Sequence, residues 1–304
     1  MNLRQLEIFR SVIRHSTTVG AAQELGISQP AVSNSIKQLE DQLGFLLFDR
    51  SGNRLMPRQE ATILYGKSEG VFLLSRDLDQ TVEDLKHRRI GHLRIAATPQ
   101  LGNTIVPSAI ASLREDHPQV RVVLDVRQSS YVIQSVETGV AEIGLALALG
   151  NRLERTVTLH DLGEVDMVCV VPSEHRFSCR DFLTARDLET EIFIGLDLDT
   201  LLGKLVKKAF EAAECRYSPG LEARYSETAC RLADAGCGMA LVDELSARSL
   251  RGMTNITVVP FRPALAVRAK AILPKGRPLS GVAELMIGEL RKTAANSLTQ
   301  TSPN

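Results

Sequence analysis

The sequence lacks the features that mark several large classes of protein. It contains no Walker-type phosphate loop, so a P-loop nucleotide-binding enzyme is not indicated. Its five cysteines are odd in number, unevenly spaced and without a C-x-x-C pair, which argues against a disulfide framework. The six histidines are scattered and form no H-x-x-x-H pair. We therefore expect no enzyme, no metal and no cofactor.

Long apolar runs and net charge are missing as well. No uninterrupted apolar stretch approaches the roughly 20 residues that a membrane span needs. Lys and Arg number 36 and so do Asp and Glu, so the overall charge indicates no nucleic-acid partner. Met1 begins directly on a charged amphipathic segment rather than a signal peptide, and we expect a cytoplasmic protein. The 304 residues, 44% of them hydrophobic, predict two or more packed domains.

The segment Thr18–Gly44 has the pattern of a helix-turn-helix for the DNA major groove. Ser28 is a good N-cap for the second helix, and Pro30 lies in its first turn, where a missing N–H costs nothing. The apolar face of the first helix consists of Ala21, Ala22 and Leu25. The helix ends at Gly26, and we expect the next residue, Ile27, to be buried.

The second helix of this segment has an apolar stripe and an opposite polar face. Short polar side chains at the start of such a helix suit base edges and phosphates. An ordinary surface hairpin of two helices is the alternative. The apolar stripe is Val32, Ile36, Leu39 and Leu43, and the polar face is Gln29, Ser33, Asn34, Lys37 and Gln38.

A hairpin follows. Two short apolar runs flank the turn signal Ser51-Gly52-Asn53, which predicts a β-hairpin wing that carries Arg50, Arg54 and Arg58 toward a phosphate backbone; a solvated basic loop is the alternative. Residues 1–58 hold seven basic and five acidic side chains, so non-specific binding by one subunit should be weak. The predicted DNA contacts are Thr18, Ser28, Gln29, Pro30, Ser33, Asn34, Lys37, Arg50 and Arg54.

Residues 1–90 resemble the winged helix-turn-helix and linker of LysR-type transcriptional regulators. The motifs LRQLEIF, AAQELGISQPAVSNSIKQLE and LGFLLFDRSGNRLMPRQEA carry the resemblance. The family usually has Arg directly after the Ser equivalent to Ser33, where this chain has Asn34. Asn can read adenine bidentately, so the operator preference is not simply inherited. The wing also has Met56-Pro57-Arg58-Gln59 in place of a Thr-Pro-type helix start.

The segment 59–90 predicts a long helix with a narrow seam for another helix. Lys86-His87-Arg88-Arg89 ends it, and Gly91 marks a domain boundary. Packing on its own domain is one interpretation. The resemblance implies the other, a linker helix that pairs two subunits, with tetramers that engage two sites on bent DNA. The seam consists of Leu64, Val71, Leu78 and Leu85 at heptad spacing, with Ala61, Ser68, Ser75 and Val82 three residues before each.

From Gly91 onward, strands and helices alternate, which predicts a parallel sheet with helices on both faces. The phrase CRLADAGCGMALVDEL resembles the LysR-type effector domain, an α/β fold similar to periplasmic solute-binding proteins. That fold implies two lobes between which the chain passes twice, so we place lobe I at 91–161 and 267–304 and lobe II at 162–266. We expect strands at 93–97, 120–126, 143–146, 167–171, 192–195, 222–225, 239–242, 256–260 and 268–273, and helices at 101–115, 130–139, 201–213, 228–235 and 281–290.

The predicted domains are therefore a winged helix-turn-helix at 1–58, a linker and dimerisation helix at 59–90, and an effector-binding domain at 91–304. Ligands in such sheets bind beyond the carboxyl ends of strands, where helix N-termini point. Four turns qualify, although plain helix capping would use the same residue types. The candidate effector contacts in these turns are Thr98, Gln100, Gln128, Ser129, Ser130, Asp197, Asp199, Thr200 and Thr228.

The ligand can be described only as a class. N–H donors and hydroxyls of the first two turns suit a carboxylate, and Asp197 and Asp199 suit an amine, which together predict an amino-acid-like zwitterion. A simple carboxylate is equally compatible, with both aspartates only capping. The stretch GHLRIAATPQLGNTIVPSAIASL and the Gln-Ser-Ser turn resemble the branch of the family that regulates amino acid and opine metabolism.

Two other functions are compatible with parts of the sequence. Some relatives sense peroxide through a cysteine pair, and Cys230 and Cys237 are seven apart, but their apolar and glycine neighbours favour small core residues over reactive thiols. A solute-binding protein for transport is the third class, against which the N-terminal segment argues. The sequence thus predicts a ligand-responsive DNA-binding transcriptional regulator. Its expected partners are a double-stranded DNA operator, a small-molecule effector, other copies in a homodimer or homotetramer, and RNA polymerase, with no membrane partner.

Overall fold

The computed structural model describes residues 1–51, 54–86, 92–147, 156–249 and 255–298. The chain forms two compact units, Met1–Asp79 and Gln80–Asn304. The division falls within the helix expected at 59–90, so the first unit holds the winged helix-turn-helix together with the first part of that helix. The bounds 1–58, 59–90 and 91–304 remain our proposal for the functional organisation.

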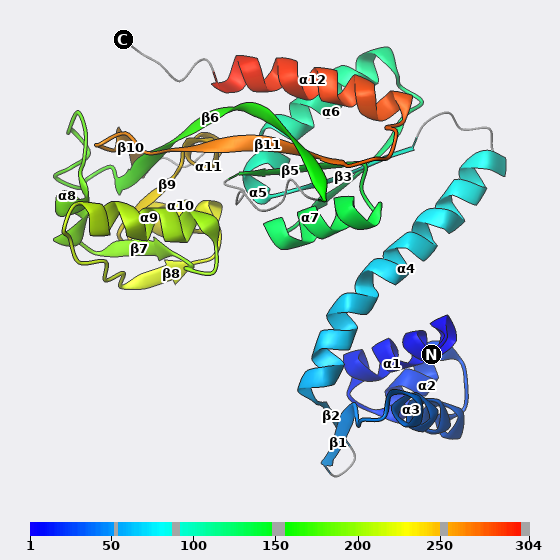
Figure 1. Cartoon of the computed structure of the whole chain (residues 1–304). Coiled ribbons are helices and arrows are strands. Elements are labelled where there is room, and N and C mark those ends of the chain that lie inside the picture. Colours follow the sequence, from blue (N-terminus) through cyan, green and yellow to red (C-terminus); the bar gives the residue numbers. More distant parts are fainter. Residues whose placement is uncertain (52–53, 87–91, 148–155, 250–254, 299–304) are drawn as a thin grey trace. The chain divides into compact units, whose positions relative to one another are not determined.

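The first unit has the predicted order of elements (Figure 1). A capping box at Asn2 and Gln5 starts the first helix. Gly26, at φ 62°, ends the second helix, and its N–H donates to the carbonyl of Ala22. The elements are α1 (Leu3–His15), α2 (Thr18–Leu25), α3 (Gln29–Leu43), β1 (Phe48–Ser51), β2 (Arg54–Pro57) and α4 (Gln59–Lys86).

A small core joins these elements. Phe9, Val12, Val32 and Leu39 are completely buried between the three short helices. The carboxylate of Glu40 accepts the backbone N–H groups of two residues at the start of the wing, Leu47 at 2.7 Å and Phe48 at 3.2 Å. The wing is thereby fixed to α3, which holds both parts of the predicted DNA-binding surface in one orientation.

The second unit contains nine strands and the remaining described helices (Figure 1). The strands are β3 (His92–Ala97), β4 (Arg121–Val126), β5 (Ile143–Leu147), β6 (Val157–Pro172), β7 (Phe193–Leu196), β8 (Leu221–Ala223), β9 (Met239–Asp243), β10 (Ile256–Pro260) and β11 (Ala266–Pro274). The helices are α5 (Pro99–Gly102), α6 (Ile105–Asp116), α7 (Ser129–Thr138), α8 (Ala185–Glu189), α9 (Leu201–Ala212), α10 (Ser226–Asp234), α11 (Glu244–Ser249) and α12 (Gly281–Leu298).

The sheet order is β4-β3-β5-β11-β6-β9-β7-β8, with β10 beside β6. The expected parallel sheet is correct for β3, β4 and β5 and for β7, β8 and β9. It is wrong for β6, β10 and β11, which pair antiparallel. The long strands β6 and β11 join the two parallel groups, so the chain passes between them as extended strands.

The pairing of β6 with β11 runs from Ala266 opposite Asp166 to Pro274 opposite Val157, with a register shift beside Gly163. Gly163 has φ 131°, a conformation that favours glycine. The lobe boundary that we propose at 161/162 falls at this irregularity. The sequence pattern predicted only 167–171 of β6, because polar residues and Gly163 interrupt the apolar pattern of its first half.

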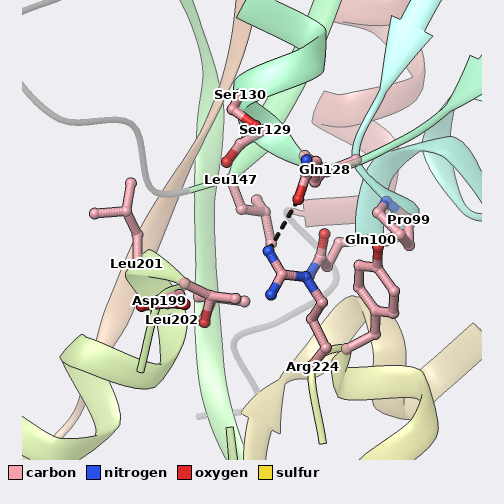
Figure 2. Close-up of a pocket in the computed structure, with 13 residues that line it drawn as sticks. Pro99, Gln100, Gln128, Ser129, Ser130, Leu147, Asp199, Leu201, Leu202 and Arg224 are labelled. Carbon is pink, nitrogen blue, oxygen red and sulfur yellow. Dashed lines mark hydrogen bonds between the residues drawn. The ribbon is translucent and has the colours of Figure 1, made fainter. Parts of the chain in front are cut away.

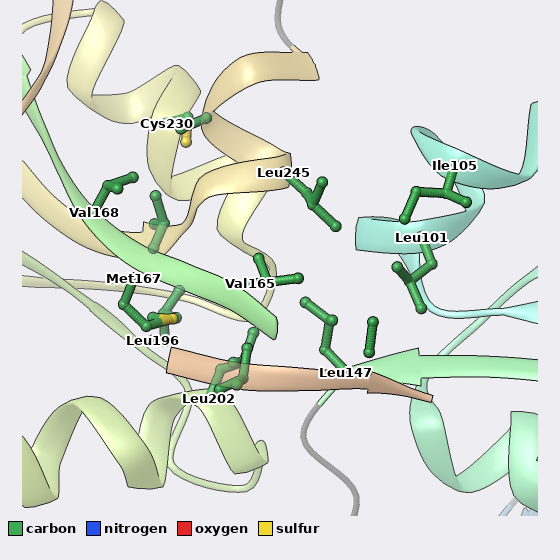
Figure 3. Packing of buried hydrophobic residues seen from close by; sticks show 14 of the residues in the cluster. Leu101, Ile105, Leu147, Val165, Met167, Val168, Leu196, Leu202, Cys230 and Leu245 are labelled. Carbon is green, nitrogen blue, oxygen red and sulfur yellow. The ribbon is translucent and has the colours of Figure 1, made fainter. Parts of the chain in front are cut away.

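Helices cover both faces of the first parallel group. Ile95 and Ala97 of β3 contribute to the main core with α6 and α12, whereas Ala96 points to a smaller cluster with Val132 and Val136 of α7. Figure 3 shows Leu147 of β5 close to Val165 of β6, where apolar side chains of the first parallel group meet those of a joining strand. The helix expected at 101–115 is divided into α5 and α6, and α8 and α11 were not predicted.

Candidate functional site

The outer side of α3 is polar and accessible, while its inner residues Val32, Ile36 and Leu39 are buried. The helix begins as predicted, with Ser28 as N-cap accepting the backbone N–H of Ala31. The exposed outer residues include Gln29, Pro30, Asn34, Lys37 and Gln38.

Three of the predicted DNA contacts form one hydrogen-bonded group. The Nε2 of Gln29 donates to Thr18 Oγ1 at 3.1 Å and to Ser33 Oγ at 3.0 Å. The bonds join the first residue of α2 to the first turns of α3. They leave the amide oxygen of Gln29 available as an acceptor on an exposed surface.

The wing presents fewer available cations than the sequence indicated. Arg58 donates to Asp49 through Nε at 2.9 Å and through Nη2, and this hydrogen bonding raises the pKa of Arg58. Arg54 is exposed, and within the described part of the chain it has no hydrogen-bond or ion-pair partner. The side chain of Arg50 lies outside the described residues. Arg54 is therefore the wing cation that the structure leaves available.

The predicted seam of helix α4 is buried in its first part and accessible in its second part. Ala61 and Ser68 are buried and Leu64 packs on the winged helix-turn-helix core, as the alternative interpretation expected. Arg10 of α1 donates to Ser68 Oγ at 2.9 Å. Further along the helix, the seam positions become accessible.

The accessible part of α4 is an apolar stripe. Val71 is 44% and Leu78 65% exposed, and Ile63 and Val82 are exposed as well. At 100° per residue these four side chains fall within an arc of about 100° on one helix face. The side chain of Leu85 lies outside the described residues. Large apolar side chains in a continuous stripe indicate a surface that another chain covers.

A cavity of about 150 Å³ lies between the carboxyl ends of strands from both parallel groups. Seven of the nine predicted effector contacts line it, and Asp197 and Thr228 do not (Figure 2). The lining residues are Thr98, Pro99, Gln100, Gln128, Ser129, Ser130, Leu147, Asp199, Thr200, Leu201, Leu202, Arg224 and Tyr225.

Helix N-termini reach this cavity from opposite sides. Gln128, the N-cap of α7, makes no side-chain capping bond. On the other side, Thr200 caps α9: its Oγ1 accepts from Gly203 N at 3.0 Å and donates to the carbonyl of Asp197 at 2.6 Å. The positive ends of both helices therefore face the cavity.

Thr98 provides an unsatisfied group at the same place. It is 6% exposed, and its Oγ1 has no hydrogen-bond partner among the described residues. A buried hydroxyl without a partner is costly, and a polar ligand would satisfy it.

The sequence did not reveal Arg224, which contributes a guanidinium to the cavity. Its Nη1 donates to Asp197 Oδ2 at 2.5 Å and its Nη2 donates to Gln128 Oε1 at 2.9 Å. Strand β8 ends at Ala223 rather than at the predicted 225, so Arg224 and Tyr225 form the turn. The predicted contact Thr228 is instead an exposed residue in the first turn of α10. The sequence signal for Arg224 was its position next to the end of a predicted strand.

The two predicted aspartates have different surroundings. Asp197 receives Arg224 at one oxygen and the backbone N–H of Asp199 at the other, at 2.8 Å. Asp199 is exposed and lines the cavity. An amine-bearing ligand would therefore meet Asp199, because Asp197 is occupied by a cation of the chain itself.

A buried carboxylate lies behind this turn. Asp243, at the end of β9, accepts from Ser246 N at 2.9 Å and from Ser246 Oγ at 3.0 Å. Burial raises the pKa of Asp243, although these hydrogen bonds act in the opposite direction. These bonds fix Asp243 at the start of α11, and Asp243 does not line the cavity.

Comparison with known proteins decides the family. The LysR substrate binding domain family matches residues 86–295, and the lysR family of bacterial regulatory helix-turn-helix proteins matches residues 3–61. The chain belongs to the LysR family of transcriptional regulators.

Relatives of this LysR-family chain match along most of their length. The regulatory protein NocR of Agrobacterium fabrum is 29% identical over 275 residues, which are 90% of this chain and 91% of that protein. The octopine catabolism/uptake operon regulatory protein OccR of Rhizobium meliloti is 32% identical over 261 residues, 86% of this chain and 85% of that one. The crystal structure of CbnR, a LysR family transcriptional regulator, has the same fold, with a TM-score of 0.75 at 16% identity over 97% of this chain and 99% of that chain.

Membership of the LysR family confirms a ligand-responsive transcriptional regulator and excludes a transport protein for solutes. The cysteine alternative is not favoured: Cys230 is completely buried, and burial raises the pKa of its thiol to about 12, which suppresses the reactive thiolate. Within the described ranges, no three metal-ligating side chains gather. No described helix has the length and apolarity to span a membrane.

Proposed function

We propose that this LysR-family regulator senses a small amino-acid-like or carboxylate effector in the cavity between its two lobes. The observation that carries the proposal is the chemistry of the lining: the N-termini of α7 and α9 face the same space, and the buried Oγ1 of Thr98 lacks a partner there among the described residues. Helix N-termini favour anions. The proposed effector contacts are Thr98, Gln100, Ser129, Ser130, Asp199 and Thr200, and Gln128 lines the same space at the start of α7.

An amine on the effector would meet Asp199, whose carboxylate is exposed at the cavity. A molecule with a carboxylate and a cationic group would thus contact both lobes. The relatives NocR and OccR, the second of which is named for octopine, support amino acids and their derivatives as the first compounds to examine. Effector binding would then shift the relative populations of lobe arrangements.

The proposed DNA contacts are the outer residues of α3 and Arg54 of the wing. Asn34 reads a base edge, with adenine as the base that an amide recognises bidentately. Gln29 is held in place by Thr18 and Ser33, and Lys37 and Arg54 contact phosphates. Specific binding requires more than one subunit, because residues 1–58 have a surplus of only two basic residues.

Assembly would use the apolar stripe of α4, which pairs two chains as a homodimer, and two dimers would form a homotetramer on DNA. Contact with RNA polymerase and a cytoplasmic place of action complete the proposal for a regulator of transcription.

A ligand screen with the full chain tests the effector proposal. Thermal unfolding is followed in the presence of amino acids, octopine and simple carboxylates, each at about 100 times the expected dissociation constant, where one-site binding adds about 2.7 kcal/mol. Thr98→Val keeps the side-chain shape and removes the hydroxyl, so it should reduce the shift. Arg114→Gln, on α6 and outside the lining, is the control. A ligand whose effect is the same in wild type and Thr98→Val would place the effector elsewhere.

A further inference from the structure

Arg224 joins the two lobes across the cavity. It follows β8 in lobe II, and its Nη2 reaches Gln128 Oε1 at the start of α7 in lobe I (Figure 2). Among the described residues that line the cavity, Arg224 is the one cation and Asp199 the one anion. The same guanidinium therefore supplies both the positive charge of the lining and a polar link between the cavity walls.

The bond to Gln128 is the weaker of the two that Arg224 makes. A neutral amide oxygen accepts it, whereas hydrogen bonds between two charged groups are roughly twice as strong. Gln128 does not need this position for its helix, because it makes no side-chain capping bond to α7. A carboxylate that entered the cavity would be a better acceptor for Nη2 than the amide that now occupies it.

Asp197 holds the other side of the guanidinium. Its Oδ2 receives Nη1 of Arg224, and its Oδ1 is fixed by the backbone N–H of Asp199 at 2.8 Å. Because Asp197 does not line the cavity, it can keep Arg224 oriented without competing for the ligand. The guanidinium is thus aimed at the start of α7, where Ser129 and Ser130 also line the cavity.

We propose that Arg224 binds the carboxylate of the effector, and that Gln128 occupies this arginine in the effector-free protein. The proposal rests on the assignment of the cavity as the effector site. On binding, the Nη2 bond passes from the Gln128 amide oxygen to a ligand carboxylate oxygen, while Asp197 keeps Nη1. The direct hydrogen bond between the lobes is then replaced by a link through the ligand. Arg224 selects for an anionic group, and Gln128 lowers the affinity because its amide oxygen competes with the ligand for Nη2.

The two residues should therefore have opposite effects on binding. Arg224→Gln removes a charge-assisted hydrogen bond, and we expect carboxylate affinity to fall by about 10- to 100-fold. Gln128→Leu removes the competitor and leaves the arginine in place, so affinity should rise by about two- to tenfold. A residue with a merely structural role would not give an increase.

Calorimetric titration of the full chain with L-arginine, and with L-argininamide, in which the carboxylate is replaced by a neutral amide, tests the proposal. Wild type should prefer L-arginine, and Arg224→Gln should lose that preference. The controls are Arg231→Gln, which removes an exposed arginine paired with Glu227 outside the lining, and Asn103→Leu, which removes the hydrogen bond between Asn103 Nδ2 and Glu227 Oε2 at 3.2 Å. Neither control should change the preference.

The outcomes separate this proposal from the assignment of the cavity. If Thr98→Val weakens L-arginine binding and Arg224→Gln does not, the cavity stands and the role of Arg224 is refuted. A decrease in affinity for Gln128→Leu would refute the competition. If all the cavity variants bind L-arginine like wild type, the effector site itself lies elsewhere.

Discussion

Substitution of Asn34 by Ala tests the proposed reading of DNA bases. Asn34 is exposed on the outer side of α3, and within the described ranges its side chain has no hydrogen-bond partner. The change should therefore cost the free protein no stability, and thermal unfolding should match wild type. Loss of a bidentate contact to a base should weaken specific binding by about 1–3 kcal/mol, or about 5- to 150-fold.

Lys37 lies three residues later on the same exposed side of α3 and is expected to act differently. A phosphate contact contributes to all sequences alike, so Lys37→Ala should weaken specific and random DNA together. It should also reduce the slope of the logarithm of affinity against the logarithm of salt concentration by about 0.9 per contact. Gln42→Ala, on the exposed C-terminal end of α3, is the control, because the N-terminal part of a recognition helix contacts the bases.

The measurement is fluorescence anisotropy on two duplexes at several salt concentrations. One duplex is an operator selected from a random pool with the purified protein, and the other is a scrambled sequence of equal length. Operators selected with Asn34→Ala should show relaxed preference at one position in each half-site. An equal loss of affinity on both duplexes for Asn34→Ala would refute base reading by this residue.

Further substitutions have defined outcomes. Leu78→Lys places a charge in the exposed stripe of α4, and sedimentation should show a smaller species with weaker operator binding, because association cannot bury an unpaired charge. Ser129→Ala and Ser130→Ala should weaken the effector response and leave effector-free DNA binding intact. Asp199→Asn should lower the affinity for amine-bearing effectors by a further factor of about ten and leave the affinity for amine-free effectors unchanged. Because the pKa of Asp243 is raised in the folded state, the folded protein keeps a proton that the unfolded chain has released. The free energy of unfolding should therefore fall as pH rises above the ordinary pKa of 3.8. Denaturant titrations should show that Asp243→Asn removes this dependence.

Each of these has an opposing result. An unchanged oligomer for Leu78→Lys would move the interface away from the stripe. An effector response that survives both serine substitutions would detach α7 from the ligand, and an equal loss for amine-free carboxylates would mean that Asp199 acts on structure rather than on the amine. A variant at Asp243 that keeps the pH dependence of wild type would assign the proton uptake to another group.

Local signals predicted the helix-turn-helix well. Ser28, Pro30 and Gly26 determine where helices begin and end through their own backbone chemistry, and the structure has the boundaries there. Such residues act within one turn of chain, so no knowledge of distant contacts is required.

The cavity was predicted less completely, because its chemistry depends on pairing between distant residues. Seven candidate contacts could be found from strand ends. The same rule could have included Arg224, but its role could not be predicted, since its partners Asp197 and Gln128 lie 27 and 96 residues away. The division of roles between Asp197 and Asp199 has the same origin: it follows from which oxygen the arginine reaches, and no spacing rule indicates that.

The antiparallel pairing of β6 with β11 limits how this domain can respond to a ligand. Both passages of the chain between the lobes belong to one hydrogen-bonded ladder, which resists stretching and in-plane bending but accepts twist, the natural deformation of paired strands. The connection between the lobes therefore favours twisting of one lobe against the other over hinge opening and closing. A ligand that draws one wall of the cavity toward the other would therefore rotate one lobe about the strand axis. This rotation would meet the least resistance at the bulge beside Gly163, where the ladder is interrupted.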